Sequence, residues 1–137
     1  MTLRRKPRTG TTAVEAAVIF PIFFLLLIGL LVFALGVSRY QEIASLAREG
    51  ARWASVRGAS YGYATGNTPA TAKDVYDNAI VPNTVLVDPS QLNYSVTWNP
   101  DNQQNSLVTV TLSYNWLPEA FFGGITLSST SSMPVSY

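Results

Sequence analysis

One uninterrupted apolar stretch, Val18 to Val37, constrains the fold of this 137-residue chain more than any other feature. Its twenty residues carry no charge, and sixteen of them are Val, Ile, Leu or Phe. Each such residue favours insertion at a bilayer centre by roughly −0.3 to −0.6 kcal/mol, so the stretch favours the membrane by about −5 to −9 kcal/mol. As a helix it rises about 30 Å, the thickness of the hydrocarbon core. The remaining chain is too small and too polar to surround such a helix, so the stretch is predicted to span a membrane.

Basic residues are concentrated on one side of this stretch. Four of them lie within the first eight residues: Arg4, Arg5, Lys6 and Arg8. After Gly58 the chain has one base, Lys73, against five acidic residues. Lys and Arg beside a span stay in the cytoplasm, so the N-terminus is predicted inside and the C-terminal domain outside, and Arg39 weakens this asymmetry only slightly. The basic cluster abuts the span and contains no aromatic residue, so no nucleic-acid partner is expected.

The composition argues against catalysis. The chain has no Cys and no His, which removes disulfides, thiolate chemistry, the commonest general base and the commonest metal ligand. We therefore expect no enzyme activity, no cofactor, no metal site and no small-molecule substrate. A membrane-anchored enzyme remains an alternative, and its candidate residues are Asp74, Asp77, Asp88, Asp101 and Glu119. Asp74 and Asp77 lie three residues apart and could bind a hard cation if the acidic residues converge in a pocket.

A single long helix is predicted from about Thr12 to Arg57. Thr11 or Thr12 can cap its start, and Gly58 is predicted to end it. Pro21 lacks an amide hydrogen, so it should bend the helix near its start. At 1.5 Å per residue the helix would be about 70 Å long, twice the thickness of a membrane. We divide this region into a basic cytoplasmic leader, residues 1–10, a transmembrane helix, residues 11–38, and an extramembrane continuation, residues 39–58.

Two features of this helix indicate packing. Gly29 and Gly36 lie seven residues apart, hence on one face, and offer a shallow groove to another helix, although glycines are also frequent in spans without such a role. Beyond the span, small or apolar residues recur every three or four positions: Ile43, Leu46, Ala47, Gly50, Trp53 and Ala54. The C-terminal part of the chain is expected to cover this stripe.

Residues 59–137 are predicted to form an extracytoplasmic α+β head. Tyr61–Asn67 is interpreted as a loop, and Thr68 with Pro69 as the cap and first residue of a short helix that stops before Pro82. Two strands with alternating apolar and polar residues follow, Leu92–Trp98 and Leu107–Tyr114, joined by a turn at residues 99–105. A third strand, Ile125–Tyr137, is rich in Ser and Thr. An antiparallel meander of this kind can pack one face on the long helix. The predicted fold class is therefore α+β.

The junction before the span has the arrangement that a prepilin peptidase recognises. Basic residues are followed by Gly10, and Glu15 is the fifth residue after it. Glycine lets the backbone extend into an active site. A carboxylate at the edge of lipid needs a partner, which a new amine on Thr11 could provide. Processing after Gly10 is therefore expected, although Gly10 can also be a flexible linker and Glu15 a complement to the helix dipole.

Two segments resemble the TadE family of the tight-adherence (Flp pilus) machinery: RTGTTAVEAAVIFPIFFLLLIGL at residues 8–30 and IASLAREGARWASVRG at residues 43–58. The family's pattern of Gly, Val-Glu and a Pro six residues after the Glu corresponds to Gly10, Val14, Glu15 and Pro21. Residues 108–133 are similar to the family's closing strands, and the resemblance implies a pilin-like fold. Thr11 stands where many type IV pilins have Phe, and Ala16 stands where Flp pilins have Tyr, which disfavours a major pilin.

The resemblance implies a non-enzymatic pseudopilin or minor pilin that takes part in Flp pilus assembly at the bacterial cytoplasmic membrane. The implied partners are the membrane, Flp pilin, a companion pseudopilin, the Tad platform proteins and a prepilin peptidase. The candidate contact lies in the Ala-Arg-Glu-Gly-Ala-Arg segment and comprises Ala47, Arg48, Glu49, Gly50 and Arg52. The apolar part of this segment can instead be covered by the protein's own sheet.

A different reading is a secreted or membrane-anchored extracytoplasmic binding domain unrelated to pili. Ala34 and Gly36 have the small-residue spacing of a signal-peptidase site, which would release the chain from Val37 onward. The apolar run is much longer than the 7 to 15 residues usual in such a signal.

Overall fold

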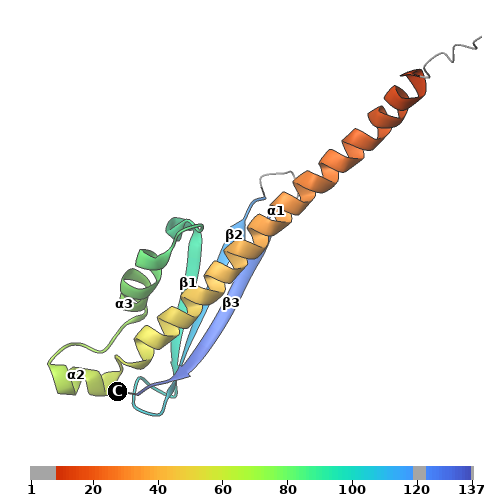
Figure 1. Cartoon of the computed structure of the whole chain (residues 1–137). Coiled ribbons are helices and arrows are strands. Elements are labelled where there is room, and N and C mark those ends of the chain that lie inside the picture. Colours follow the sequence, from red (N-terminus) through yellow and green to blue (C-terminus); the bar gives the residue numbers. More distant parts are fainter. Residues whose placement is uncertain (1–8, 119–122, 137) are drawn as a thin grey trace, which may run out of the picture.

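A computed structural model describes residues 9–118 and 123–136 of the chain. Helix α1, Thr9–Ser55, runs from one end of the molecule to the other, and a small head of short helices and three strands packs on its C-terminal half (Figure 1). This arrangement confirms the predicted α+β class, with a long N-terminal helix and an antiparallel meander packed on it.

The ends of α1 differ from those predicted. The helix begins at Thr9, so Thr11 and Thr12 lie within its first turns and neither is the residue before the helix. At the other end α1 stops at Ser55, and Gly58 is not a left-handed stop, because its φ of −74° and ψ of −167° are extended. Arg57 closes the helix instead: its Nη1 donates to the carbonyl of Trp53 at 3.2 Å. A cation at this end also complements the helix dipole.

The predicted loop at residues 61–67 is largely wrong, because helix α2 spans Ala59–Thr65. Gly66 ends α2 in the left-handed conformation, with φ of 74°, and its amide donates to the carbonyl of Gly62. Glycine adopts this conformation without the steric penalty of a Cβ, so Gly66 is the usual kind of helix stop.

The next helical segment begins later than predicted. Helix α3 spans Ala72–Val75 and continues as a π-helical turn, Tyr76–Ile80, and a 3-10 turn, Val81–Asn83. Its cap is Thr71 and not Thr68: the Thr71 hydroxyl accepts from the Asp74 amide, and the Asp74 carboxylate accepts from the Thr71 amide at 2.9 Å. This reciprocal pair is a capping box. The segment includes Pro82, which was predicted to lie just beyond it.

The sheet has the order β1-β2-β3 and is antiparallel throughout. Its strands are β1, Leu92–Asn99, β2, Leu107–Trp116, and β3, Ile125–Pro134, so the last strand ends three residues before the predicted Tyr137. A short 3-10 turn, Pro89–Gln91, precedes β1. Alternate residues of β2 point into the core, while the opposite face carries Ser and Thr, such as Thr111, which hydrogen-bonds Thr130 at 3.0 Å.

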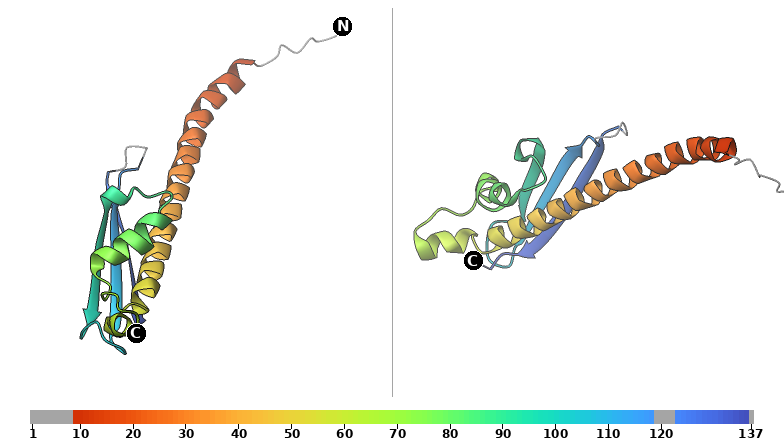
Figure 2. Two further views of the ribbon diagram at one scale, coloured as in Figure 1. Left: turned by 90° about the vertical axis from the view of Figure 1, so that its left-hand side faces the viewer. Right: turned by 45° about the horizontal axis from the view of Figure 1, so that its top comes forward.

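The core lies between this sheet and two helices that share one of its faces. Helices α1 and α3 lie side by side over that face (Figure 2). The largest fully buried side chains come from α1, the α3 segment, the sheet and the residue that follows β3: Ile43, Val75, Ile80, Val108, Val110, Leu112 and Val135. Helix α1 thus supplies one wall of the core with its C-terminal half, while its N-terminal half extends beyond the head.

Candidate membrane span, groove and assembly surface

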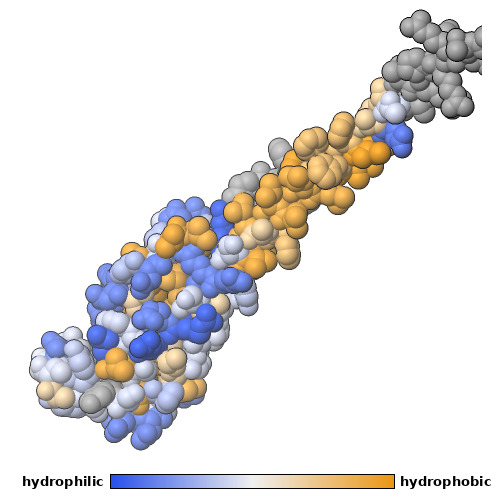
Figure 3. Space-filling view, in the orientation of Figure 1, coloured by the Kyte–Doolittle hydropathy of each residue, from blue (hydrophilic) through white to orange (hydrophobic). Residues whose placement is uncertain are grey.

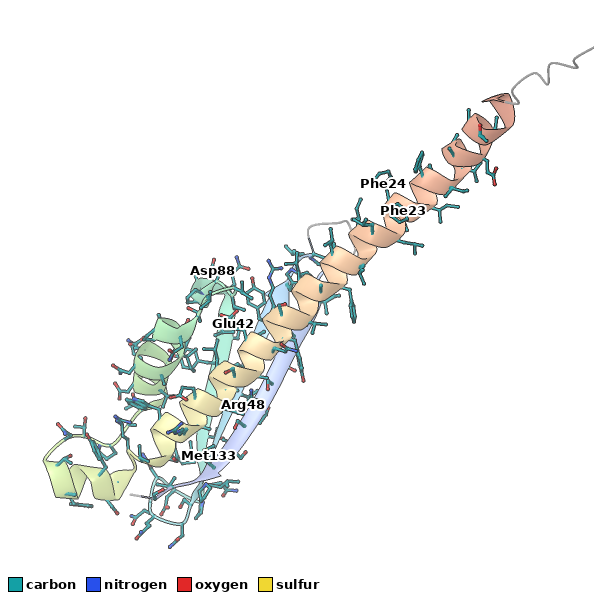
Figure 4. All side chains as sticks on the ribbon, viewed as in Figure 1. Phe23, Phe24, Glu42, Arg48, Asp88 and Met133 are labelled. Atoms are coloured by element: carbon teal, nitrogen blue, oxygen red, sulfur yellow. The ribbon has the colours of Figure 1, made fainter. Side chains whose placement is uncertain are left out.

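The N-terminal half of α1 has apolar side chains on every side, and most of them are exposed. Figure 3 shows this half as a continuous apolar band, and Figure 4 shows Phe23 and Phe24 on the part of α1 that extends beyond the head. Residues that are more than half exposed occur at nearly every position, including Val18, Phe20, Leu25 and Leu30. Helix α1 is long and apolar enough to cross a membrane, and none of its most apolar window is buried in the protein. It is a candidate membrane span.

The processing residues lie at the start of this half. Gly10 and Thr11 are in the first turn of α1, whereas Gly10 was predicted to be the last residue of the leader that precedes the helix. Glu15 is exposed on the second turn, beyond the first turn in which a carboxylate complements the helix dipole best. Residues 1–8 of the basic leader lie outside the described part of the chain. Helix α1 continues through Pro21 without interruption and curves gently over its apolar half (Figure 2).

The two glycines of the span have different surroundings. Gly36 is buried, and a Cβ built there would lie 2.6 Å from Cζ3 of Trp116, at the end of β2. The place that the sequence offered to another helix is therefore taken at Gly36 by the protein's own sheet. A Cβ at Gly29 would meet nothing within 4 Å. Trp116 therefore approaches the helix closely at Gly36, whereas no described group approaches it at Gly29.

An apolar groove opens beside these glycines. It has a volume of about 500 Å³ and lies between α1 and the ends of β2 and β3. Its lining is almost wholly apolar and includes Gly29, Val32 and Phe33 from α1 and Trp116, Pro118 and Ile125 from the sheet side. The groove therefore begins within the candidate span and ends against the head.

Aromatic and basic side chains gather at the end of the groove nearest the head. The guanidinium carbon of Arg39 lies 5.1 Å from the centroid of the Trp116 ring, within the range of a cation–π contact. Tyr40 lines the same groove and is about half exposed. Trp and Tyr are enriched where a span leaves the hydrocarbon for the headgroup region, so this is the composition of a membrane–water boundary.

The candidate contact segment on α1 is divided between the core and the surface. Ala47 is fully buried, and Gly50 is buried where a Cβ would lie 3.4 Å from side-chain atoms of Val75 and Val110. Their faces are covered by the protein's own α3 and β2. Arg48, Glu49 and Arg52 are exposed, and Figure 4 shows Arg48 on α1 at the level of the head. Only these three charged side chains are accessible to a partner.

Glu42 is a structural residue that the sequence did not single out. Its carboxylate accepts hydrogen bonds from the backbone amides of Val85 and Leu86, the latter at 2.9 and 3.0 Å. Bonds of this charge-assisted kind are stronger than neutral ones. They hold the loop before β1 against α1, where Glu42 and Asp88 lie near the end of the head that adjoins the span (Figure 4). The only sequence feature that could have indicated this role is that Glu42, a charged residue, lies next to the apolar stripe that begins at Ile43.

The acidic residues of the head are engaged in separate local interactions. Asp74 caps α3, and hydrogen bonds from Thr71 lower the pKa of its carboxyl below the usual value. Asp88 caps the 3-10 turn before β1, and hydrogen bonds from Ser90 lower its pKa in the same way. Asp77 pairs with Lys73, and Asp101 accepts from the Ser106 hydroxyl at 2.7 Å. Within residues 9–118 and 123–136 no three His, Cys, Asp or Glu side chains form a group that could hold a metal ion, and Glu119 lies outside them.

This geometry defines a class of protein: a chain with one candidate membrane span whose helix continues without a break into a small α+β head. Within that class, the family model described as TadE-like protein matches residues 10–52, which confirms the resemblance to the TadE family. The match covers less than half of the chain. It starts at Gly10 and ends within α1, so it does not include residues 108–133, whose similarity to the family's strands stays a prediction. No curated protein and no solved structure matches the chain.

Proposed function

We propose that the chain is a non-enzymatic pseudopilin or minor pilin that takes part in assembling Flp pili from the bacterial cytoplasmic membrane. Its N-terminus lies in the cytoplasm, α1 crosses the bilayer, and the head lies outside. The observation that carries the proposal is the family match at residues 10–52, which begins at the glycine of the expected cleavage site and covers most of α1.

In this proposal a prepilin peptidase cuts after Gly10, and the new amine on Thr11 can pair with Glu15 of its own or a neighbouring chain. Processing leaves the apolar half of α1 attached, so the mature subunit stays in the membrane. The protein then acts by lateral packing of its helix and by contacts of its head. Its partners are Flp pilin, a companion pseudopilin, the Tad platform proteins and the peptidase.

The exposed charges Arg48, Glu49 and Arg52 are the proposed contact with these partners. They lie on the family-matched segment, yet no part of the described head covers them. Charged side chains at an interface rim mainly influence association rate and specificity. Charge reversal by Arg48→Glu should therefore weaken pilus assembly without unfolding the head, whereas Lys73→Glu, an exposed reversal outside the matched segment, should not.

N-terminal sequencing of the protein from membranes tests processing, with and without a prepilin peptidase. A start at Thr11 that needs the peptidase supports the proposal, and Gly10→Val should abolish it by placing a branched side chain at the cut. A start at Val37 favours the secreted-domain alternative, although that bond lies inside α1 beside the Gly36–Trp116 contact. An intact Met1 in both strains contradicts processing and leaves an anchored extracytoplasmic domain.

A further inference from the structure

The apolar groove between α1 and the sheet overlaps the candidate span in height. Gly29 lies eleven residues after Val18, or about 16 Å along the helix, and Gly36 lies about 27 Å along it. If the hydrocarbon begins at Val18, the groove extends from the middle of the bilayer to its outer boundary at about 30 Å. The head then does not start where the membrane ends, because the ends of β2 and β3 lie beside the last turns of the span.

Glu15 limits how far the span can shift to avoid this overlap. Moving the groove clear of the hydrocarbon requires a span that starts about two and a half turns earlier. Such a shift would place the Glu15 carboxylate inside the hydrocarbon, where an ionisable group is costly. The apolar residues from Val18 onward are long enough to cross the hydrocarbon, so a span that starts there leaves Glu15 outside it. The overlap is therefore the cheaper arrangement.

Other apolar side chains on the same end of the head fit this placement. Leu117, next to Trp116, is 75% exposed, and Ile125 at the start of β3 is 47% exposed. Val85 is 85% exposed, and its loop is held against α1 by Glu42. Figure 3 shows apolar surface on the end of the head that adjoins the span. Exposed apolar groups on one side of a molecule indicate contact with a partner or a membrane.

The lining of the groove decides what can fill it. Water is held in cavities by two to four polar partners, and this lining offers almost none. A second membrane helix packs closely through a row of small residues, but Trp116 covers Gly36 and leaves only Gly29 open. Hydrocarbon chains of lipid surround the open side of the groove at this depth, and they can fill an irregular apolar space.

We infer that the groove binds phospholipid acyl chains of the outer leaflet, and that the end of the head formed by Trp116, Leu117 and Ile125 is immersed in that leaflet. Arg39 and Tyr40 then lie at the headgroup boundary, where basic and aromatic side chains are favoured. The inference rests on the proposed membrane span. It adds a specific contact between head and lipid that a simple anchored domain would lack.

The test uses the full chain in phospholipid vesicles and quenching of tryptophan emission by lipids brominated on their acyl chains. Trp53→Phe with Trp98→Phe leaves Trp116 as the only tryptophan. Trp98→Phe with Trp116→Phe leaves Trp53, which lies near the far end of α1, as the matched control. Replacing all three by Phe and adding Phe24→Trp reports on the span itself. Circular dichroism checks that each variant retains its helix and sheet.

We expect the Phe24→Trp protein and the Trp116 protein to lose most of their emission, and the Trp53 protein to keep it. Emission from Trp116 that is no more quenched than that from Trp53 overturns the inference while the span stands. An unquenched Phe24→Trp protein removes the span and the proposed membrane role together. If quenching of Trp116 disappears as the protein-to-lipid ratio rises, a second copy of the chain fills the groove. That result also overturns the inference.

A second pair of variants tests the groove without altering Trp116. Gly29→Phe places a ring where a Cβ meets open space, so it should fill the groove and reduce quenching of Trp116. Ala34→Phe adds the same ring to the same helix at a residue that does not line the groove. Equal quenching in the two variants would falsify occupancy of the groove by acyl chains.

Discussion

The two halves of α1 form one continuous helix but meet different surroundings. From Val18 to about Leu35 the side chains are apolar on all sides and exposed, with no part of the described head over most of them. From Gly36 to Ser55 only one face is apolar, and it is buried against the sheet and α3. Three glycines mark the change: Gly29 is open, Gly36 lies under Trp116, and Gly50 is enclosed in the core.

The two halves show that one continuous helix can meet two different requirements on its side chains, depending on whether the rest of the protein packs against it. In the first half most side chains have no fixed neighbour within the protein, so any apolar residue can serve. In the second half the shape of each residue is set by fixed neighbours, as at Gly50, because protein interiors are close-packed. Substitutions should therefore act very differently in the two halves.

The largest contrast is expected between two isoleucines of α1. Ile43 is fully buried in the head, so Ile43→Ala should lower the free energy of unfolding of the head by about 2 to 5 kcal/mol. Ile28 is about half exposed in the apolar half, and Ile28→Ala should change the same quantity by less than about 0.5 kcal/mol. Urea unfolding in detergent micelles, followed by tryptophan fluorescence, measures both. Equal effects would show that the head reaches further along α1 than Gly29.

The boundary between the halves is sharpened by two glycine substitutions. Gly36→Ala forces a Cβ against Trp116, and overpacking of this kind costs about 1 to 3 kcal/mol. The gain of about 1 kcal/mol from removing a helical glycine offsets part of that cost. Gly29→Ala should show the gain alone. The unfolding midpoint and the emission maximum of Trp116 should change for Gly36→Ala, and an unshifted emission maximum would contradict the contact.

A smaller effect is expected from the cap of α3, which stabilises the head and leaves the span unchanged. Thr71→Ala removes the hydroxyl that accepts from the Asp74 amide and should cost about 1 kcal/mol of head stability. Thr68→Ala, at the exposed position that the sequence placed at the cap, is the control and should be neutral. The same urea titration distinguishes them, and equal losses would mean that neither residue is the cap.

The smallest effect is a loss of head stability in acid. The pKa values of Asp74 and Asp88 are lowered in the folded chain by hydrogen bonds from Thr71 and Ser90. Groups with lowered pKa values contribute stability above their unfolded pKa of about 3.9, and that stability is lost as the pH falls through the folded value. The urea midpoint should fall below about pH 4. Replacing both residues by Asn should reduce this pH dependence, and a midpoint that rises in acid would exclude it.

Local patterns in the sequence were enough to predict the long helix, the three strands and their meander order. Periodicity identifies these elements because each repeats a burial pattern over several residues. The same reasoning failed where the signal is short. Helix α2 was missed because Gly62 and the tyrosines around it resemble a loop, although Gly66 is a recognisable stop. The α3 cap was predicted at Thr68 because a proline, Pro69, follows it and proline is common at the first helical position. Thr71 and Asp74 have the spacing of a capping box and form the actual cap.

The contacts that define the candidate site were not predictable from local sequence. Trp116 and Gly36 are eighty residues apart in the chain, and Glu42 binds amides more than forty residues away. A glycine in a span or a glutamate beside an apolar stripe does not indicate its partner. The sequence therefore predicted where the candidate membrane span lies, but not that Trp116 packs on Gly36 near its end.

The absence of a break in α1 between Thr9 and Ser55 has a mechanical consequence. An axial displacement of the apolar half of α1 also displaces the sheet, because the same helix forms one wall of the core. One turn of travel, about 5.4 Å, carries the whole head by the same amount. Any force that moves the helix along its axis must therefore move Trp116 and the rest of the head in the same step, because no flexible linker separates the two halves of α1.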